Sequence, residues 1–259
     1  MEYFVYHFQL FLLIMMRMSS MMVIAPFYSS GVMPFKMKAI VAFFTTIIIF
    51  PVIAGRGYVI PAHMGGYTLL VVQEVLIGLY IGFLVSVVFA AFQLAGQYFA
   101  VQMGFGINEV IDPLAQVSIP LIGQFKNLLG LLIFLAMNGH HFLIQAVYRS
   151  YELAPGLNLG PQMTAGLMRY MTYVFSGMFV VALKIALPVL ATMFLLEVSM
   201  GVLAKAAPQM NIMMLGFPFK IMVSLGVLIL TAPLIVRVMY VSLDRSFNFI
   251  ARMLHHWPA

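Results

Sequence analysis

Long apolar runs, nearly free of charge, follow one another along the whole chain. A helix that crosses the hydrocarbon core of a bilayer needs about 20 mainly apolar residues. About six segments reach or approach that length, and they cover roughly residues 4–25, 39–55, 67–100, 122–148, 162–206 and 217–252. The first run lacks the basic segment that precedes a cleaved signal, so we expect it to be a mature span. The pattern predicts an all-α membrane protein of about six long apolar helices.

The third, fifth and sixth runs are longer than one bilayer thickness, because a helix rises about 1.5 Å per residue. Tilting, kinking or protrusion must take up the excess. The last two runs predict a C-terminal helical hairpin, since a proline cannot continue a helix and asparagine tolerates turn geometry. We place its turn at Pro208, Gln209, Met210 and Asn211. The basic residues at the helix ends divide evenly between the two sides and give no orientation.

Composition supports the membrane interpretation and excludes several classes of function. Hydrophobic residues make up 64% of the chain and charged residues 8%, against about 45–50% and about 25% in a soluble domain. The net charge of +6 comes from single basic residues scattered between apolar runs, so no nucleic-acid-binding patch is expected. The chain has no cysteine, which excludes disulfides, thiolate nucleophiles and cysteine-based metal sites.

An unusual stretch separates the third and fourth runs, within about residues 101–121. Two glycines flank an aromatic residue and an acid precedes a proline, which predicts a non-helical loop. Its candidate residues are Gln102, Met103, Gly104, Phe105, Gly106, Ile107, Asp112 and Pro113. Non-helical backbone among apolar helices is tolerated where it is buried in protein or lines a wet cavity. The hypothesis is a pore-lining or pore-blocking loop; the alternative is an ordinary surface loop.

Among the charged residues inside the apolar runs, the candidates for buried charges are Arg17, Glu74, Lys184 and Glu197. Each costs at least ~2.5 kcal/mol in a membrane span unless it is paired or wet, so each must face protein or water. They predict ion pairs between helices or subunits, with a proton or ion relay through Glu74 and Glu197 as the alternative. Lys184 and Glu197 lie about 220° apart around one helix and cannot pair with each other.

Other motifs give weaker signals. Gly78 and Gly82 form a GxxxG pattern that permits close helix packing. The adjacent His140 and His141 point about 100° apart on a helix, so hydrogen bonding near the membrane surface is favoured over a metal site. No nucleophile elbow, phosphate loop, zinc motif or dinucleotide fingerprint occurs in the sequence. We therefore expect no enzymatic activity and no cofactor.

Taken together, these stretches resemble the FliR family of flagellar export-gate proteins and its counterparts in virulence-type type III secretion systems. The resemblance covers nearly the whole chain and rests on the order and spacing of several features. They are Arg17 with Pro26, Pro34 and Lys36; Glu74 with Gly78 and Gly82; Gln93 to Gln97; Gln102 to Pro113; Asn138-Gly139-His140; and Pro208 to Asn211 with Gly216 and Pro218.

The resemblance implies a non-enzymatic gate subunit in the bacterial inner membrane, at the flagellar basal body. Such a subunit joins FliP-like and FliQ-like subunits around the channel for unfolded flagellar proteins, beside FlhB-like and FlhA-like components. It also implies a FliP-like part over residues 1–160, whose loop plugs the channel, and a FliQ-like hairpin over residues 161–259. Two other functions stay open: a proton- or ion-coupled small-molecule transporter using Glu74, Asp112 and Glu197, and an assembly scaffold that conducts nothing.

Overall fold

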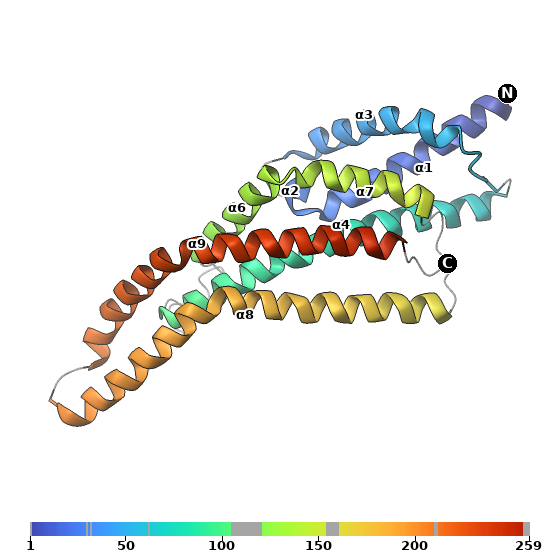
Figure 1. Ribbon diagram of the computed structural model, residues 1–259. Coiled ribbons are helices and arrows are strands. Elements are labelled where there is room, and N and C mark those ends of the chain that lie inside the picture. The colour runs from blue at the N-terminus through green and yellow to red at the C-terminus, as the bar shows by residue number, and fades with distance from the viewer. Residues whose placement is uncertain are drawn as a thin grey trace. The chain divides into compact units, whose positions relative to one another are not determined.

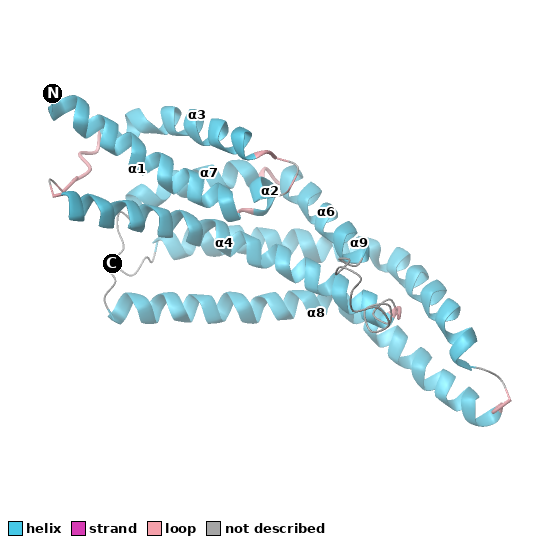
Figure 2. Cartoon of the chain, turned by 180° about the vertical axis from the view of Figure 1, so that it is seen from behind, coloured by secondary structure: helices cyan, strands magenta, loops and turns pink. Residues whose placement is uncertain are grey.

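The computed structural model describes residues 2–29, 31, 33–61, 63–104, 121–153, 161–209 and 212–255. Helices account for most of these residues, and no strand occurs among them (Figures 1 and 2). In chain order the helices are α1 (Glu2–Ile24), α2 (Pro26–Ser29), α3 (Phe35–Ala54), α4 (Met64–Gln102), α6 (Leu121–Ala136), α7 (Gly139–Leu153), α8 (Pro161–Ala206) and α9 (Ile212–His255). The prediction of an all-α membrane protein is confirmed.

Five helices are long and apolar enough to cross a membrane, and the pair α6 and α7 together make a sixth candidate span within the described residues. The lengths of the third, fifth and sixth runs are also as predicted. Helix α8 contains 46 residues and is about 69 Å long, against about 30 Å for the hydrocarbon core of a bilayer. Large apolar side chains lie exposed on α3, α8 and α9, among them Ile48, Leu187 and Leu230.

The fourth run differs from the prediction of one continuous helix over 122–148. The chain bends by 65° between α6 and α7. Asn138 lies at the bend with a φ of 56°, in the left-handed region that asparagine tolerates better than most residues. The amides of His141 and Phe142 then bond to the Asn138 carbonyl and start α7. A single residue therefore breaks a helix within the charge-free stretch from Asn127 to Tyr148.

The described chain forms two compact units, and several helices pass from one into the other. Unit 1 consists of residues 1–87, 134–174 and 243–259, and unit 2 of residues 88–133 and 175–242. Fully buried apolar side chains fill the interior of each. In unit 1 they include Leu10, Leu13, Ile14, Met18, Leu143 and Ile250, and in unit 2 Phe92, Ala95, Phe99, Ala186, Val189 and Met239.

Glycines set the closest helix contacts in both units. In unit 1, a Cβ placed on Gly78 would collide with Ser20 Oγ and the Arg17 carbonyl oxygen, and one on Gly82 would lie 2.7 Å from the Met21 carbonyl oxygen. The GxxxG prediction of close packing is thus confirmed, with α1 as the neighbour of α4. In unit 2, Gly96 of α4 lies directly against Gly123 of α6.

Candidate functional site

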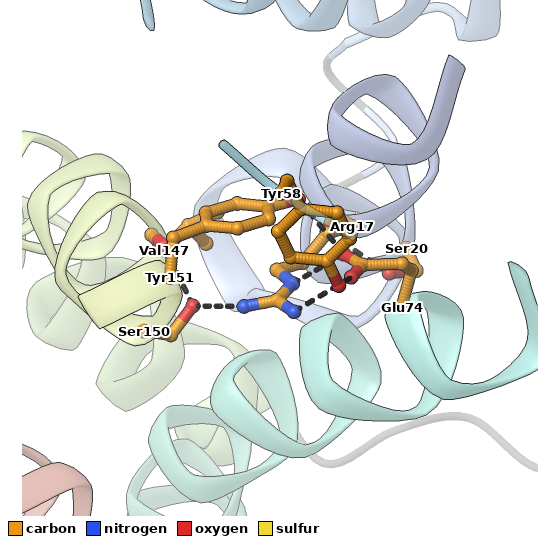
Figure 3. A network of polar contacts seen from close by, with 7 residues as sticks. All are labelled: Arg17, Ser20, Tyr58, Glu74, Val147, Ser150 and Tyr151. Carbon is orange, nitrogen blue, oxygen red and sulfur yellow. Dashed lines mark hydrogen bonds and ion pairs between the residues drawn. The ribbon is translucent and has the colours of Figure 1, made fainter. Parts of the chain in front are cut away.

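Arg17 and Glu74 form a buried ion pair between α1 and α4 in unit 1 (Figure 3). Arg17 donates from Nε to Glu74 Oε2 over 2.5 Å and from Nη2 to Glu74 Oε1 over 2.8 Å. The two side chains are 0% and 1% exposed. Close packing at Gly78, one helical turn after Glu74, brings the two helices near enough for this two-point contact.

Three further residues complete the polar network. Tyr58, which precedes α4, donates its hydroxyl to Glu74 Oε1 over 2.8 Å, and Tyr151 of α7 donates to Glu74 Oε2 over 2.8 Å. Arg17 Nη1 donates to Ser150 Oγ over 2.8 Å. The hydroxyl of Ser150 in turn donates to the Val147 carbonyl. Figure 3 shows these side chains gathered around the pair of Arg17 and Glu74.

The network satisfies the Glu74 carboxylate fully, because each of its two oxygens accepts two hydrogen bonds. Burial and the adjacent Glu74 carboxylate raise the pKa of Tyr58, so this phenol remains a donor at neutral pH. The carboxylate is thus held from α1, from the segment before α4 and from α7. This geometry suits a fixed cross-link between these elements.

A second, more exposed ion pair lies beside the network. Arg56 Nη2 lies 2.5 Å from Glu152 Oε1 and 3.0 Å from the Tyr148 hydroxyl. Next to it is a cavity of about 410 Å³, which Arg56, Tyr58, Gln73 and Tyr151 line together with apolar residues. Tyr6 donates its hydroxyl to the Tyr58 carbonyl over 2.8 Å and holds the segment before α4 in place.

The other two predicted intramembrane charges lie in unit 2. Glu197 of α8 accepts a hydrogen bond from Lys220 of α9 over 2.7 Å, and both side chains are partly exposed. Lys184 is exposed on α8 and forms no ion pair with any residue that the structure describes. Among the four predicted charges, the structure thus pairs Arg17 with Glu74 in unit 1 and pairs Glu197 with Lys220 in unit 2.

The predicted loop and turn lie partly outside the described residues. Gln102 is the last residue of α4, Met103 is buried, and Gly104 has a φ of 86°, with Phe217 of α9 beside it. Phe105, Gly106, Ile107, Asp112 and Pro113 lie outside the described residues. At the hairpin, Pro208 and Gln209 form a turn between α8 and α9, and Met210 and Asn211 lie outside the described residues.

Sequence reasoning did not single out Tyr58, Ser150, Tyr151 or Lys126. The first three contact Arg17 or Glu74, but hydroxyl-bearing residues near helix ends are common and carry no specific signal. Lys126 of α6 is 2% exposed and its Nζ lies 2.9 Å from the centre of the Phe99 ring. Its position five residues after the start of α6 resembles that of an ordinary interfacial lysine.

His140 and His141 lie side by side in α7, with ring centroids 4.2 Å apart. Phe27 lies against His140, with ring centroids 6.1 Å apart. No group of three or more potential metal ligands occurs among the residues that were placed. Hydrogen bonding was predicted for this pair, but His140 Nδ1 is buried with no hydrogen-bond partner among the described residues.

The fold, the apolar spans and the buried ion-pair network define a polytopic all-helical membrane protein. The family model described as "Bacterial export proteins, family 1" matches residues 8–246. The flagellar biosynthetic protein FliR of Bacillus subtilis is 35% identical over 224 residues, which is 86% of this chain and 85% of the relative. FliR of Escherichia coli is 28% identical over 94% of this chain and 92% of the relative. FliR of Aquifex aeolicus is 27% identical over 85% and 83%.

The chain belongs to this family of bacterial export proteins, as the resemblance to FliR had indicated. It is a membrane component of the flagellar export apparatus.

Proposed function

We propose that the chain is a subunit of the export gate, in the bacterial inner membrane at the flagellar basal body. With FliP-like and FliQ-like subunits it forms the channel through which unfolded flagellar proteins leave the cytoplasm. FlhB-like and FlhA-like components are its further partners. The role is that of a passive conduit and not of an enzyme. Membership of the FliR family and the similarity over most of the chain support the proposal.

One observation about this chain supports a multi-subunit assembly. Lys184 is exposed on α8, and exposed Leu183 and Leu187 flank it. An ammonium group on an apolar helix is costly in lipid, so another protein or water must cover this part of α8. The exposed face continues at Phe194 and Leu195. A long apolar surface with a cation inside it suits contact with neighbouring subunits better than contact with lipid alone.

The proposal divides the chain into two parts with different partners. Residues 1–160 form the FliP-like part, whose segment at about 101–121 plugs the channel, and residues 161–259 form the FliQ-like hairpin. The buried charges then have two roles. Arg17 and Glu74 cross-link the helices of this chain, whereas Lys184, and Glu197 with Lys220, lie at contacts with other subunits.

Affinity purification of the tagged chain from the solubilised membranes of flagellated bacteria tests the proposal. Stable recovery of FliP-like and FliQ-like subunits is expected. Charge reversal at Lys184 should reduce that recovery, and the matched control Leu187→Met should not. Recovery of the chain alone, together with solute uptake by vesicles that contain only this chain, would favour the transporter. Recovery with partners in gates that never conduct an exported protein would favour the scaffold.

A further inference from the structure

Four neutral amide side chains lie exposed where α4 and α6 pack together in unit 2. They are Gln93 and Gln97 on α4, and Gln124 and Asn127 on α6. Large apolar side chains also lie exposed close to them on the same two helices, namely Val101, Phe125 and Leu128. An amide transferred to hydrocarbon without a partner costs several kcal/mol. Four of them together therefore require a polar neighbour.

The packing of the two helices puts these amides on one side. Gly96 lies against Gly123, and Phe92 lies against Gly130, so α4 and α6 run antiparallel at this contact. At about 100° per residue, Gln93 and Gln97 lie roughly 60–100° around α4 from Gly96, and Gln124 and Asn127 lie roughly 40–100° around α6 from Gly123. The direction of rotation, viewed from the N-terminus of each helix, is the same on both helices. When two antiparallel helices face each other, residues rotated in the same direction from the contact lie on the same side of the helix pair.

The positions of Lys126 and Phe99, on the other side of the helix pair, agree with this geometry. Each lies about 60° from the contact line in the other sense, and the two side chains meet and are buried. The helix pair thus has a closed side, where the ammonium group lies on an aromatic ring, and an open side that carries the four amides. We call Gln93, Gln97, Gln124 and Asn127 the amide surface.

We propose that the amide surface contacts the backbone of the extended polypeptide during export. Each primary amide offers donors and an acceptor, and so matches a peptide group of any sequence. Residues four apart on a helix are about 6.0 Å apart along its axis, close to the roughly 6.6 Å repeat of alternate residues in an extended chain. Neutral side chains bind such a chain without selecting for its charge. This inference rests on the proposed function.

The occupant follows from this chemistry. Exported proteins differ in their side chains and share only their peptide groups, so a surface that handles many of them must recognise the backbone. The amides also lie on the two helices that lead into and out of the segment predicted to plug the channel. A helix of a neighbouring subunit would offer far fewer free peptide groups, because its own backbone hydrogen bonds are satisfied internally.

Site-specific photo-crosslinking in assembled gates tests this directly. A photo-crosslinking amino acid is placed at Gln97, at Gln124, or at Ile48 of α3 as a control, which is 72% exposed on an apolar helix. The probe is a flagellar export substrate fused to a domain that cannot unfold, so that the chain stalls in the channel. Crosslinks to the stalled substrate are expected at 97 and 124 and not at 48. Crosslinks only to gate subunits or lipid, with or without substrate, overturn the inference.

A functional measurement uses two matched variants. Gln93→Leu with Gln97→Leu removes the hydrogen bonds and should lower the export rate about tenfold, with the amount of assembled gate unchanged. The paired Gln→Asn changes keep the amides and should retain most of the export. Normal export by the leucine variant overturns the inference, and so does loss of assembly, which would place the amides against a subunit. Failure of the unmodified chain to purify with FliP-like and FliQ-like partners would contradict the proposed function itself, independently of the amide surface.

Discussion

The Cζ atom of Arg17 lies 3.8 Å from the centre of the Tyr151 ring. The Arg17 guanidinium thus pairs with Glu74 through one edge, at Nε and Nη2, and stacks with its face on the Tyr151 ring. Only a planar cation makes both contacts at once. This relationship between α1 and α7 explains why one arginine is accommodated in an otherwise apolar helix, and it leads to the first prediction.

Arg17→Lys should destabilise the protein although it preserves the charge. A lysine ammonium cannot make the two-point contact with Glu74 and donate to Ser150 while stacking on Tyr151. We expect a loss of about 1–3 kcal/mol from the unsatisfied groups. Thermal unfolding of the purified protein in detergent measures it. Unfolding at an unchanged temperature would show that only the charge matters.

Glu74→Gln should be more damaging, because it leaves the Arg17 cation buried without a counter-ion. Breaking a buried pair from one side costs about 3–5 kcal/mol. The double variant Arg17→Met with Glu74→Leu should recover part of that loss, since no charge is left buried. Membrane abundance and thermal unfolding compare the three proteins. A double variant no more stable than Glu74→Gln would contradict the ion-pair explanation.

Tyr58→Phe should weaken stability near neutral pH and change its dependence on alkaline pH. Tyr58 lies outside the spans, and burial and Glu74 raise its pKa. Unfolded tyrosine ionises near pH 10, so the stability from this phenol is complete below about pH 10 and declines as the pH rises through its raised pKa. Unfolding temperatures followed from about pH 8 to 11 should fall less steeply in Tyr58→Phe. Parallel curves would contradict this.

Gly78→Ala should separate α1 from α4, because its methyl group would collide with the Arg17 carbonyl oxygen and Ser20 Oγ. Overpacking of this kind costs about 1–3 kcal/mol. Gly65→Ala in the same helix is the matched control, since a Cβ there meets nothing within 4 Å. Thermal unfolding should distinguish the two. Equal effects would mean that helix propensity and not packing decides.

Lys126→Met should leave stability unchanged or raise it. The buried Nζ has no hydrogen-bond partner among the described residues, and its ring contact with Phe99 offsets only about 2 kcal/mol of desolvation. Methionine has a similar length and is apolar. Phe99→Leu, which keeps the lysine and removes the ring, should destabilise the protein. A stable Phe99→Leu together with an unstable Lys126→Met would contradict the interpretation of the ring contact.

The sequence predicted the helices well because each apolar run had to reach membrane length. It also predicted close packing at Gly78 and Gly82, since small residues four apart leave space for a neighbouring backbone. The break at Asn138 was missed because it depends on the φ angle of one residue within a charge-free run. Tyr58 and Tyr151 were missed for another reason. Their contacts with Glu74 span 16 and 77 residues, and helical periodicity relates only near neighbours.

The network of Arg17 also constrains how the chain enters the membrane. During synthesis, Arg17 leaves the ribosome earlier than its partners, because Glu74 follows it by 57 residues and Ser150 by 133 residues. Until those partners arrive, the first helix carries an uncompensated cation, which costs at least ~2.5 kcal/mol in lipid. The first helix is therefore least stable in the membrane before α4 is made, and the network of Arg17 is complete only after α7 has emerged from the ribosome.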